Sequence, residues 1–169
     1  MGMPNKLKHF NVFLNGTSYL HKTPELTLPK LSRKMEEYRG GGMPGPIQID
    51  LGQEAMEMEW TLGGIERDML RQYGKSTADG VMLRFAGAYQ DETSEQWMAV
   101  EIVVRGRFKE LDFGTAKPGD DTTVKATMPL AYYKLSINGS TEIEIDVLNS
   151  ILNIGGIDSL ADVRKIIGI

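Results

Sequence analysis

Cysteine is missing from the 169-residue chain, and histidine occurs only as His9 and His21. Without thiols the chain can form neither disulfides nor thiolate metal sites, and two histidines give little basis for a histidine-built site. No apolar run approaches the roughly 20 residues of a membrane-spanning helix, and Met1–Phe10 has no apolar stretch like that of a signal peptide. We therefore expect a protein made and folded in a reducing cytoplasm, with no membrane anchor.

The sequence also lacks a recognisable catalytic constellation. It contains no nucleophile elbow, no HExxH pair and no EF-hand loop. Asp120–Asp121 follows Pro118–Gly119, a context typical of a turn. Glu57 and Glu59 would lie about 7 Å apart on one strand face, but a solvated or channel-lining face explains them better than a catalytic carboxylate pair. We predict no enzymatic activity, no cofactor and no metal site.

The composition is that of a soluble globular protein, which we interpret as one domain spanning residues 1–169. Apolar residues make up 41% and charged residues 25% of the chain, and this length is sufficient for a core. The net charge of −4 argues against a nucleic-acid-binding protein. Residues 1–39 carry seven bases and three acids, whereas residues 40–66 carry five acids and no base. The charges of these two segments are either scattered over a solvated surface or form complementary faces that meet between copies of the chain.

Alternation of apolar and polar residues dominates the chain and predicts a mostly antiparallel β structure. Asn15–Gly16 and Asn138–Gly139 each stand between two alternating segments, which is a strong hairpin signal because both residue types tolerate positive φ. Two of the predicted strands are long. In the first we expect a bend, for which Gly106 is the candidate position, and in the second Pro129 suggests a bulge or an edge. The further strands are expected over 56–62, 81–89, 96–108 and 122–137.

Only two segments predict a helix. The first covers 65–73, ends at Gly74 and gathers four apolar residues on one face: Ile65, Met69, Leu70 and Tyr73. In the second, near the C-terminus, Ser159 and Asp162 resemble a capping box and Gly168 ends the helix. Its apolar stripe consists of Leu160, Val163 and Ile167.

Residues Gly40 to Gly45 spell G-x-G-x-x-G, the pattern of a dinucleotide-binding loop. That loop requires a helix directly after it, whereas Pro44 and Pro46 are followed by the strand-like segment Ile47–Asp50. We therefore expect the glycine-rich segment to form a protruding loop, or to lie where another backbone approaches it closely. The later Gly74-Lys75-Ser76 is no P-loop either, because the glycine that should stand five residues earlier is replaced by methionine.

Several segments resemble a known family, in the same order and over essentially the whole chain. They are Leu26–Leu31 continuing through Lys34, Glu37, Tyr38–Met43 and Asp50–Gly52; Arg105–Asp112; Leu130–Leu135; Glu144–Asp146; Asn149; Gly156–Asp158; and the final Ile167–Ile169. Together they resemble the major tail tube protein of contractile-tailed phages and of the related R-type pyocins.

The resemblance implies an antiparallel β-sandwich or barrel-like tail tube fold with one or two short helices. It implies subunits that assemble as hexameric rings, which stack into the inner tube of a contractile virion tail around a lumen lined by one continuous β-barrel. The implied partners are other copies of the chain, the tail sheath protein, the tape measure protein, the baseplate tube-initiating protein and the tail terminator. In a phage, DNA later passes through the lumen without specific binding.

Two sets of residues are candidate sites within this picture. We expect the loop around residues 34–50 to protrude and to dock on the adjoining ring, with the inter-ring contact made by Tyr38, Arg39, Gly40, Gly41, Gly42, Met43 and Pro44. We expect an acidic to neutral lumen, because a negative wall repels DNA phosphates. The candidate lumen-facing residues are Glu57, Glu59, Glu101, Glu142 and Glu144, each alternating with apolar neighbours; which of their strands faces inward stays open.

Alternatives remain open at this point. The tube can belong to a pyocin-like particle, where it serves puncture or ion passage, or to a type VI-like secretion system. A different class is a free-standing β-sandwich binding module, for example for carbohydrate, although the two tryptophans form no evident shared platform.

Overall fold

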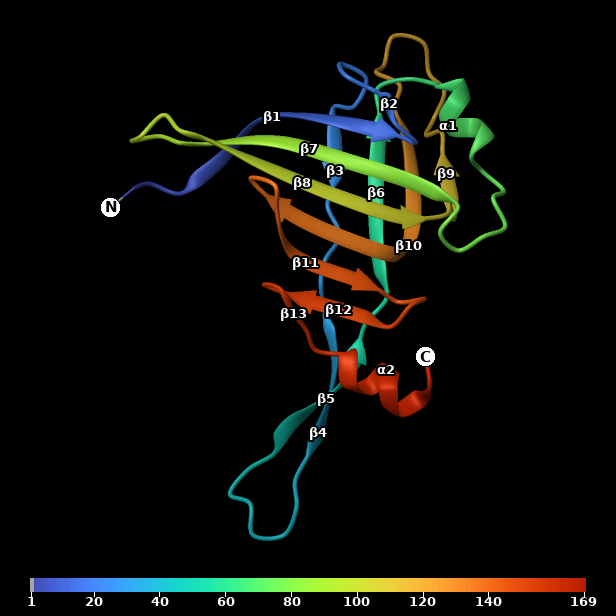
Figure 1. The fold of residues 1–169 in the computed structure, drawn as a ribbon. Coiled ribbons are helices and arrows are strands. Elements are labelled where there is room, and N and C mark those ends of the chain that lie inside the picture. Colours follow the sequence, from blue (N-terminus) through green and yellow to red (C-terminus); the bar gives the residue numbers. More distant parts are fainter. Residues whose placement is uncertain (1) are drawn as a thin grey trace.

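The computed structural model of the chain describes residues 2–169 and is built almost entirely from antiparallel strands (Figure 1). Two short helices accompany them, so the predicted mainly β fold class is confirmed. The elements are β1 (Asn5–Leu14), β2 (Thr17–Ser18), β3 (Glu25–Thr27), β4 (Arg33–Tyr38), β5 (Ile47–Gln53), β6 (Met56–Leu62), α1 (Arg67–Arg71), β7 (Val81–Asp91), β8 (Trp97–Gly106), β9 (Glu110–Asp112), β10 (Val124–Ile137), β11 (Ser140–Asp146), β12 (Ile151–Ile154), β13 (Ile157–Asp158) and α2 (Ala161–Ile167).

Eleven of the strands form one sheet, whose main path runs β13-β12-β11-β10-β8-β7-β1-β2. The two predicted hairpin turns are confirmed. Asn15 and Gly16 have φ of 47° and 89° between β1 and β2, and Asn138 and Gly139 have φ of 49° and 85° between β10 and β11. Positive φ at both central residues is what a two-residue hairpin turn of matching twist requires.

Strand β10 is irregular just after Pro129, where the sequence predicts a bulge or an edge, and the sheet divides there. On one side β10 pairs first with β9 and then with β8; on the other, its first half pairs with β6 and its second half with β11. The register shifts between Leu130 and Tyr132, opposite Gly106. A Cβ added at Gly106 would lie 2.1 Å from the carbonyl oxygen of Pro129, so the bend depends on a backbone approach that only glycine permits.

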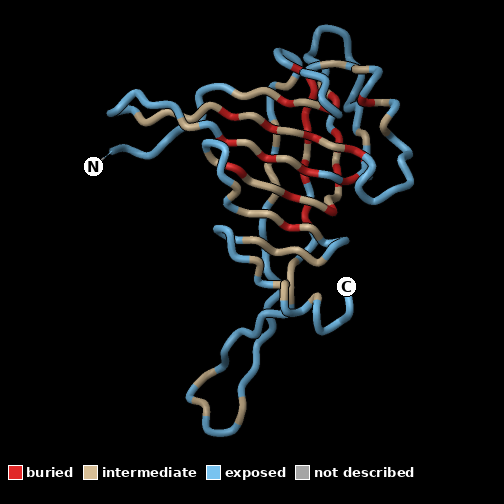
Figure 2. Tube along the Cα trace, in the orientation of Figure 1, coloured by how far each residue is buried: buried red, intermediate tan, exposed pale blue. Residues whose placement is uncertain are grey.

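The division creates two walls with a core between them. The long wall consists of β1, β2, β7, β8, the second half of β10, and β11–β13; the short wall consists of β3, β6, β9 and the first half of β10. Trp60 of the short wall is fully buried, stacks edge-on against Tyr19 at 5.1 Å and donates its indole N–H to Thr23 Oγ1 at 3.0 Å. Figure 2 shows the buried residues gathered where the two walls overlap. The largest of them are Trp60, Met56, Met58, Leu62, Met69, Leu83 and Met128.

Helix α1 is shorter than predicted, and part of its predicted apolar face is wrong. Met69 is buried, but Ile65 and Tyr73 are 65% and 57% exposed because the helix spans only one turn and the chain leaves the core on either side of it. The C-cap is Gln72, not Gly74; Gly74 follows with a φ of 94°.

Helix α2 begins without the predicted capping box. Leu160 is the N-cap residue, and the Ser159 hydroxyl instead donates to the carbonyl oxygen of Leu152 at 3.2 Å. Gly168 ends the helix in the left-handed conformation as predicted, with a φ of 84°. Val163 and Ile167, two members of the apolar stripe, lie exposed to solvent.

Strands β4 and β5 pair only with each other within residues 2–169 and project from the body of the molecule beside α2 (Figure 1). We call residues 33–53 the arm. In Figure 2 its surface is exposed along nearly its whole length. Neither of the two described helices is long and apolar enough to cross a membrane.

Candidate assembly surfaces

The arm carries an apolar face that nothing in the described chain covers. Tyr38 pairs with Ile47 and Glu36 with Ile49, which places the β5 side chains Ile47, Ile49 and Leu51 on one face by strand alternation. The exposed fractions of Tyr38, Ile47 and Leu51 are 54%, 55% and 55%. An isolated two-stranded hairpin is marginally stable in water, so this face is suited to a contact with another molecule.

The tip of the arm holds all seven residues that the sequence assigned to inter-ring contact: Tyr38, Arg39, Gly40, Gly41, Gly42, Met43 and Pro44. The backbone N–H of Met43 donates to the Gly40 carbonyl at 3.3 Å, closing a turn, and Arg39 Nε donates to the Met43 carbonyl at 3.3 Å. These bonds order the tip without any second chain.

The three glycines of the tip have different roles. Gly42 alone among them has a positive φ, 84°. A Cβ at Gly40 would meet the Tyr38 hydroxyl at 3.2 Å, whereas a Cβ at Gly41 would meet nothing within 4 Å. One left-handed residue therefore suffices to reverse the four-residue turn at the tip. The G-x-G-x-x-G pattern lies between two strands, as the sequence predicted for its context.

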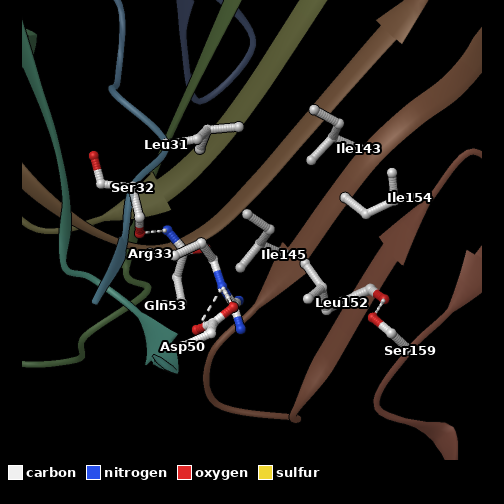
Figure 3. A pocket seen from close by; sticks show the side chains of 10 residues that line it. All are labelled: Leu31, Ser32, Arg33, Asp50, Gln53, Ile143, Ile145, Leu152, Ile154 and Ser159. Carbon is white, nitrogen blue, oxygen red and sulfur yellow. Dashed lines mark hydrogen bonds and ion pairs between the residues drawn. The ribbon is translucent and has the colours of Figure 1, made fainter. Parts of the chain in front are cut away.

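A groove of about 410 Å³ lies where the base of the arm meets β11 and β12 (Figure 3). Its apolar lining residues are Leu31, Ile143, Ile145, Leu152 and Ile154. At its mouth Arg33 Nε donates to Asp50 Oδ2 at 2.9 Å. This hydrogen bond, with a second one from the Gly52 N–H, holds the pKa of the Asp50 carboxyl below its usual value. The ion pair thus ties the two strands of the arm together at its base.

Sequence reasoning missed this groove. The alternation of Ile143 and Ile145 with glutamates indicated a half-buried strand, and those isoleucines do face the core side of the sheet. Ile145 is buried, but Ile143 is partly exposed because the short wall does not extend far enough to cover all of β11 and β12. The groove depends on how the two walls pack together, and the periodicity of a single strand gives no information about that packing.

Three of the five candidate lumen residues lie on β8 and β11 of the long wall. Glu101 and Glu144 point away from the core, and Glu142 lies at the bulge where the β10–β11 register shifts. They are interleaved with bases on the same face, so the face is mixed in charge. Its charged residues are Arg84, Glu101, Arg105, Lys134, Glu142, Glu144 and Asp146, ordered by the registers of β7, β8, β10 and β11.

Charged groups on this face are held by specific partners. Arg84 Nη1 donates to Glu101 Oε2 at 3.1 Å, and its guanidinium lies 4.1 Å from the centroid of the Phe13 ring. The Tyr132 hydroxyl donates to Glu144 Oε2 at 2.6 Å. Burial, followed by this hydrogen bond and the glutamate charge, raises the pKa of Tyr132. Paired in this way, the carboxylates of Glu101 and Glu144 are fixed in position.

The other two candidates, Glu57 and Glu59, lie on β6 of the short wall. Their side chains alternate with the buried Met56, Met58 and Trp60, so they point away from the core on the opposite side of the molecule from Glu101 and Glu144. Glu57 pairs with Lys109 at 3.5 Å. Since the two walls enclose one core, the five glutamates form two separate groups, and one surface cannot contain all of them.

Residues 2–169 contain no group of three or more histidine, aspartate or glutamate side chains arranged to hold a metal ion. The segment Gly74-Lys75-Ser76 follows α1 and precedes β7, so no helix begins at its end. The geometry therefore presents surfaces for contact between proteins: an apolar arm, a groove at its base and two charged walls.

Comparison with known proteins shows that the chain is similar to phage tail tube proteins. Residues 4–168 match the family described as phage tail tube protein FII. The chain is 45% identical over 172 aligned positions to the tail tube protein of Escherichia phage P2, with 100% of both chains covered. It is 39% identical over 153 positions to the major tail tube protein of Serratia phage KSP20, covering 89% of this chain and 88% of that one.

Solved structures of contractile injection systems share the fold. A chain of the anti-feeding prophage cap, which terminates that tube, has a TM-score of 0.60 at 12% identity, covering 80% of this chain and 93% of that chain. A chain of the sheath–tube complex of an extracellular contractile injection system, PVC, in the extended state has a TM-score of 0.59 at 10% identity, covering 79% and 91%. At such identities the likeness shows the fold alone.

Proposed function

The chain belongs to the phage tail tube protein FII family, and from this premise we propose that it stacks as hexameric rings to form the inner tube of a contractile phage tail. The observation that carries the stacking proposal is the arm, a hairpin with an exposed apolar face that nothing within residues 2–169 covers. The family is structural, and the tail is where its members work. We favour a phage tail over a pyocin-like or type VI-like tube because the relatives at 45% and 39% identity are phage proteins.

Ring formation is supported by the ends of the long wall. β1 pairs with β7 along one edge, and its other edge is unpaired within residues 2–169 from Asn5 to Asn11. Exposed strand edges favour pairing or covering by another chain. A surface at one end of the sheet that contacts a different surface at the other end is a heterologous contact, and such contacts close into rings when the rotation permits.

The long wall is the proposed lining of the lumen. Its path extends from edge to edge of the subunit, so six copies placed side by side make a continuous barrel wall. Glu101, Glu142 and Glu144 then face the lumen, together with bases that leave the surface near neutral. A lumen without a strong positive field lets DNA pass without binding. Glu57 and Glu59, on the short wall, face outward.

The arm is the proposed inter-ring contact. Burying Ile47 and Ile49 against the adjoining ring removes two large apolar side chains from water, worth about 1.5–3 kcal/mol each when burial is complete. Pro44 and Pro46 limit the conformational freedom that the tip loses on docking. Repetition around the ring multiplies this small contribution.

The outward wall and the tube ends are the proposed contacts for the other tail components. The partners of such a tube are the sheath around it, the tape measure protein within it, the baseplate protein that initiates it and the terminator that ends it. The chain itself has a mechanical role and no catalytic one, and it requires no cofactor.

Purified protein tests this proposal directly. Size-exclusion chromatography followed by negative-stain electron microscopy should show six-fold rings and hollow tubes. A compact monomer at all concentrations, with no rings or tubes, would contradict it and would favour a free-standing binding module.

A further inference from the structure

The arm and α1 lie at opposite ends of the short wall. Along the chain the arm directly precedes β6, and α1 follows β6 after a short connection. In Figure 1 the arm continues the line of β3 and β6 beyond the body, and α1 lies beside the other end of that line. Copies placed one after another along this line therefore bring the arm of one copy to α1 of the next.

The segment around α1 holds apolar side chains in solvent. Met69 is buried and anchors the single turn, whereas Ile65 before the helix and Tyr73 after it are 65% and 57% exposed. We call Ile65, Arg67 and Tyr73 the α1 surface. Because Met69 fixes the turn to the body, these side chains are held outward and are accessible to another chain.

The charges of the arm and of the α1 surface are complementary. Glu36 lies directly across from Ile49, on the apolar face of the arm, and is exposed with no ion-pair partner within residues 2–169. Arg67 is likewise exposed and unpaired in that part of the chain. The carboxylates on either side of Arg67 already have cationic partners: Glu66 pairs with Lys22 at 3.1 Å and Asp68 with Arg71 at 4.0 Å.

A contact between the arm and α1 leaves the long wall undisturbed. Both elements are joined to β6 of the short wall, so the contact lies outside the sheet that is the proposed lining of the lumen. Strands of a closed barrel are inclined by about 35–45° to its axis. The arm runs across the strands of the long wall (Figure 1), so its direction has a component along the tube axis and takes it out of its own ring.

We propose that the arm of one copy docks on the α1 surface of a copy in the adjoining ring. Ile47 and Ile49 then pack against Tyr73, and Glu36 lies beside Arg67. The inference rests on the proposed stacking of rings and names the surface that receives the arm. Because the two surfaces differ and lie at opposite ends of the subunit, the contact is heterologous and continues from ring to ring without closing. The two ends of a finished tube then differ, since one presents free arms and the other free α1 surfaces.

The absence of cysteine makes a cross-linking test specific. Tubes assembled from a chain with Tyr38→Cys and Tyr73→Cys are treated with a short bis-maleimide. We expect a ladder of covalent oligomers that continues beyond six copies, because each arm is linked to the next ring. A mixture of the two single-cysteine chains should give only dimers, since each copy then carries one thiol. Tyr38→Cys combined with Ile166→Cys, which is 83% exposed on α2 at the arm end of the molecule, should give no ladder.

Charge reversal tests the same contact without a cross-linker. Glu36→Arg and Arg67→Glu should each lower the fraction of subunits in tubes at least roughly fivefold, because each places like charges together, and the double variant should restore it. Glu37→Arg is the matched control, because Glu37 pairs with Gln48 on the opposite face of the arm, and it should assemble like the parent. Circular dichroism spectra should be unchanged throughout. A double variant no better than the single ones would overturn the pairing of Glu36 with Arg67.

The cross-linking outcomes separate this contact from the proposed function. Normal tubes that give no ladder from the cysteines at Tyr38 and Tyr73 would overturn the contact and leave the proposed function standing. A ladder that stops at six copies would also overturn it, by placing the arm against a copy in its own ring. A ladder from the cysteines at Tyr38 and Ile166 would overturn it by assigning the arm to α2. Failure of the unmodified chain to form rings or tubes would instead contradict the proposed function.

Discussion

Tyr38 lies directly across from Ile47 at the outermost pair of the arm, and both side chains are more than half exposed although each is large and apolar. Such a pair gains little while it stays in water, because the hydrophobic contribution requires burial. Under the proposed function, the pair contributes to stability when the arm docks on the adjoining ring and both side chains are buried.

Substitution of Ile47 and Ile49 by serine should abolish long tubes and leave single rings. The arm makes no strand pairs with the body, so the free energy of unfolding of the subunit should change little. Electron microscopy and sedimentation velocity measure the ratio of tubes to rings. Gln48→Ser is the matched control, because Gln48 points to the opposite face of the same strand. Equal loss of tubes in the control would show that the apolar face is not the contact.

The glycines at the tip should differ in their tolerance of a side chain. Gly42→Val places a β-branched residue at a φ of 84°, at an expected cost of about 1–2 kcal/mol in the turn, and should reduce tube length. Gly41→Val meets no atom within 4 Å and has no positive φ, so it should assemble more normally. Tube-length distributions of the two variants, compared with the triple variant of Gly40, Gly41 and Gly42, provide the measurement. The reverse order of severity would contradict the geometry of the tip.

Gly106→Ala should destabilise the subunit itself. The added Cβ would lie 2.1 Å from the Pro129 carbonyl oxygen, and relief of such overpacking typically costs about 1–3 kcal/mol. Urea unfolding gives this value when Gly106→Ala and its parent are compared as single rings, both carrying the serine substitutions in the arm. A Gly106→Ala subunit as stable as its parent would mean that β10 is not bent against β8 in this way.

The ion pair that holds α2 predicts a pH dependence of stability. The hydrogen bond from Arg164 lowers the pKa of Asp158 below its ordinary 3.8, so the pair stabilises the fold above that pH and the contribution is lost as the pH falls through the lower folded value. Asp158→Asn should therefore be less stable than the parent at pH 6, and the difference should shrink near pH 3. Urea unfolding at both pH values tests this, and a difference that is independent of pH would exclude the pair as its source.

Much of the fold was predictable because it depends on local signals. The Asn-Gly turns, the alternating strands and the bend near Gly106 and Pro129 follow from backbone preferences of the residues involved. The short length of α1 and the exposure of the apolar stripe of α2 were not predictable. In both cases an apolar stripe was present in the sequence, but whether a core surface lies beneath it depends on where the two walls end.

The candidate sites were predictable to a similar extent. Sequence alone indicated a loop around residues 34–50 and glutamates on strand faces. It did not indicate the apolar face of the arm or the groove at its base, because both arise from cross-strand register and from the limits of the short wall. The sequence also did not show that Glu57 and Glu59 lie on a different wall from Glu101 and Glu144. Alternation along a strand predicts which face of that strand a side chain occupies, but it does not predict which wall the strand joins.

A cryo-electron microscopy structure of tubes assembled from the unmodified chain tests the central claim most directly. The account predicts six-fold rings in which Ile47 and Ile49 of each arm are buried against the adjoining ring, while Glu101 and Glu144 line the channel. Tubes in which the arm lies free in solvent, or in which the long wall faces outward and Glu57 and Glu59 line the channel, would contradict it.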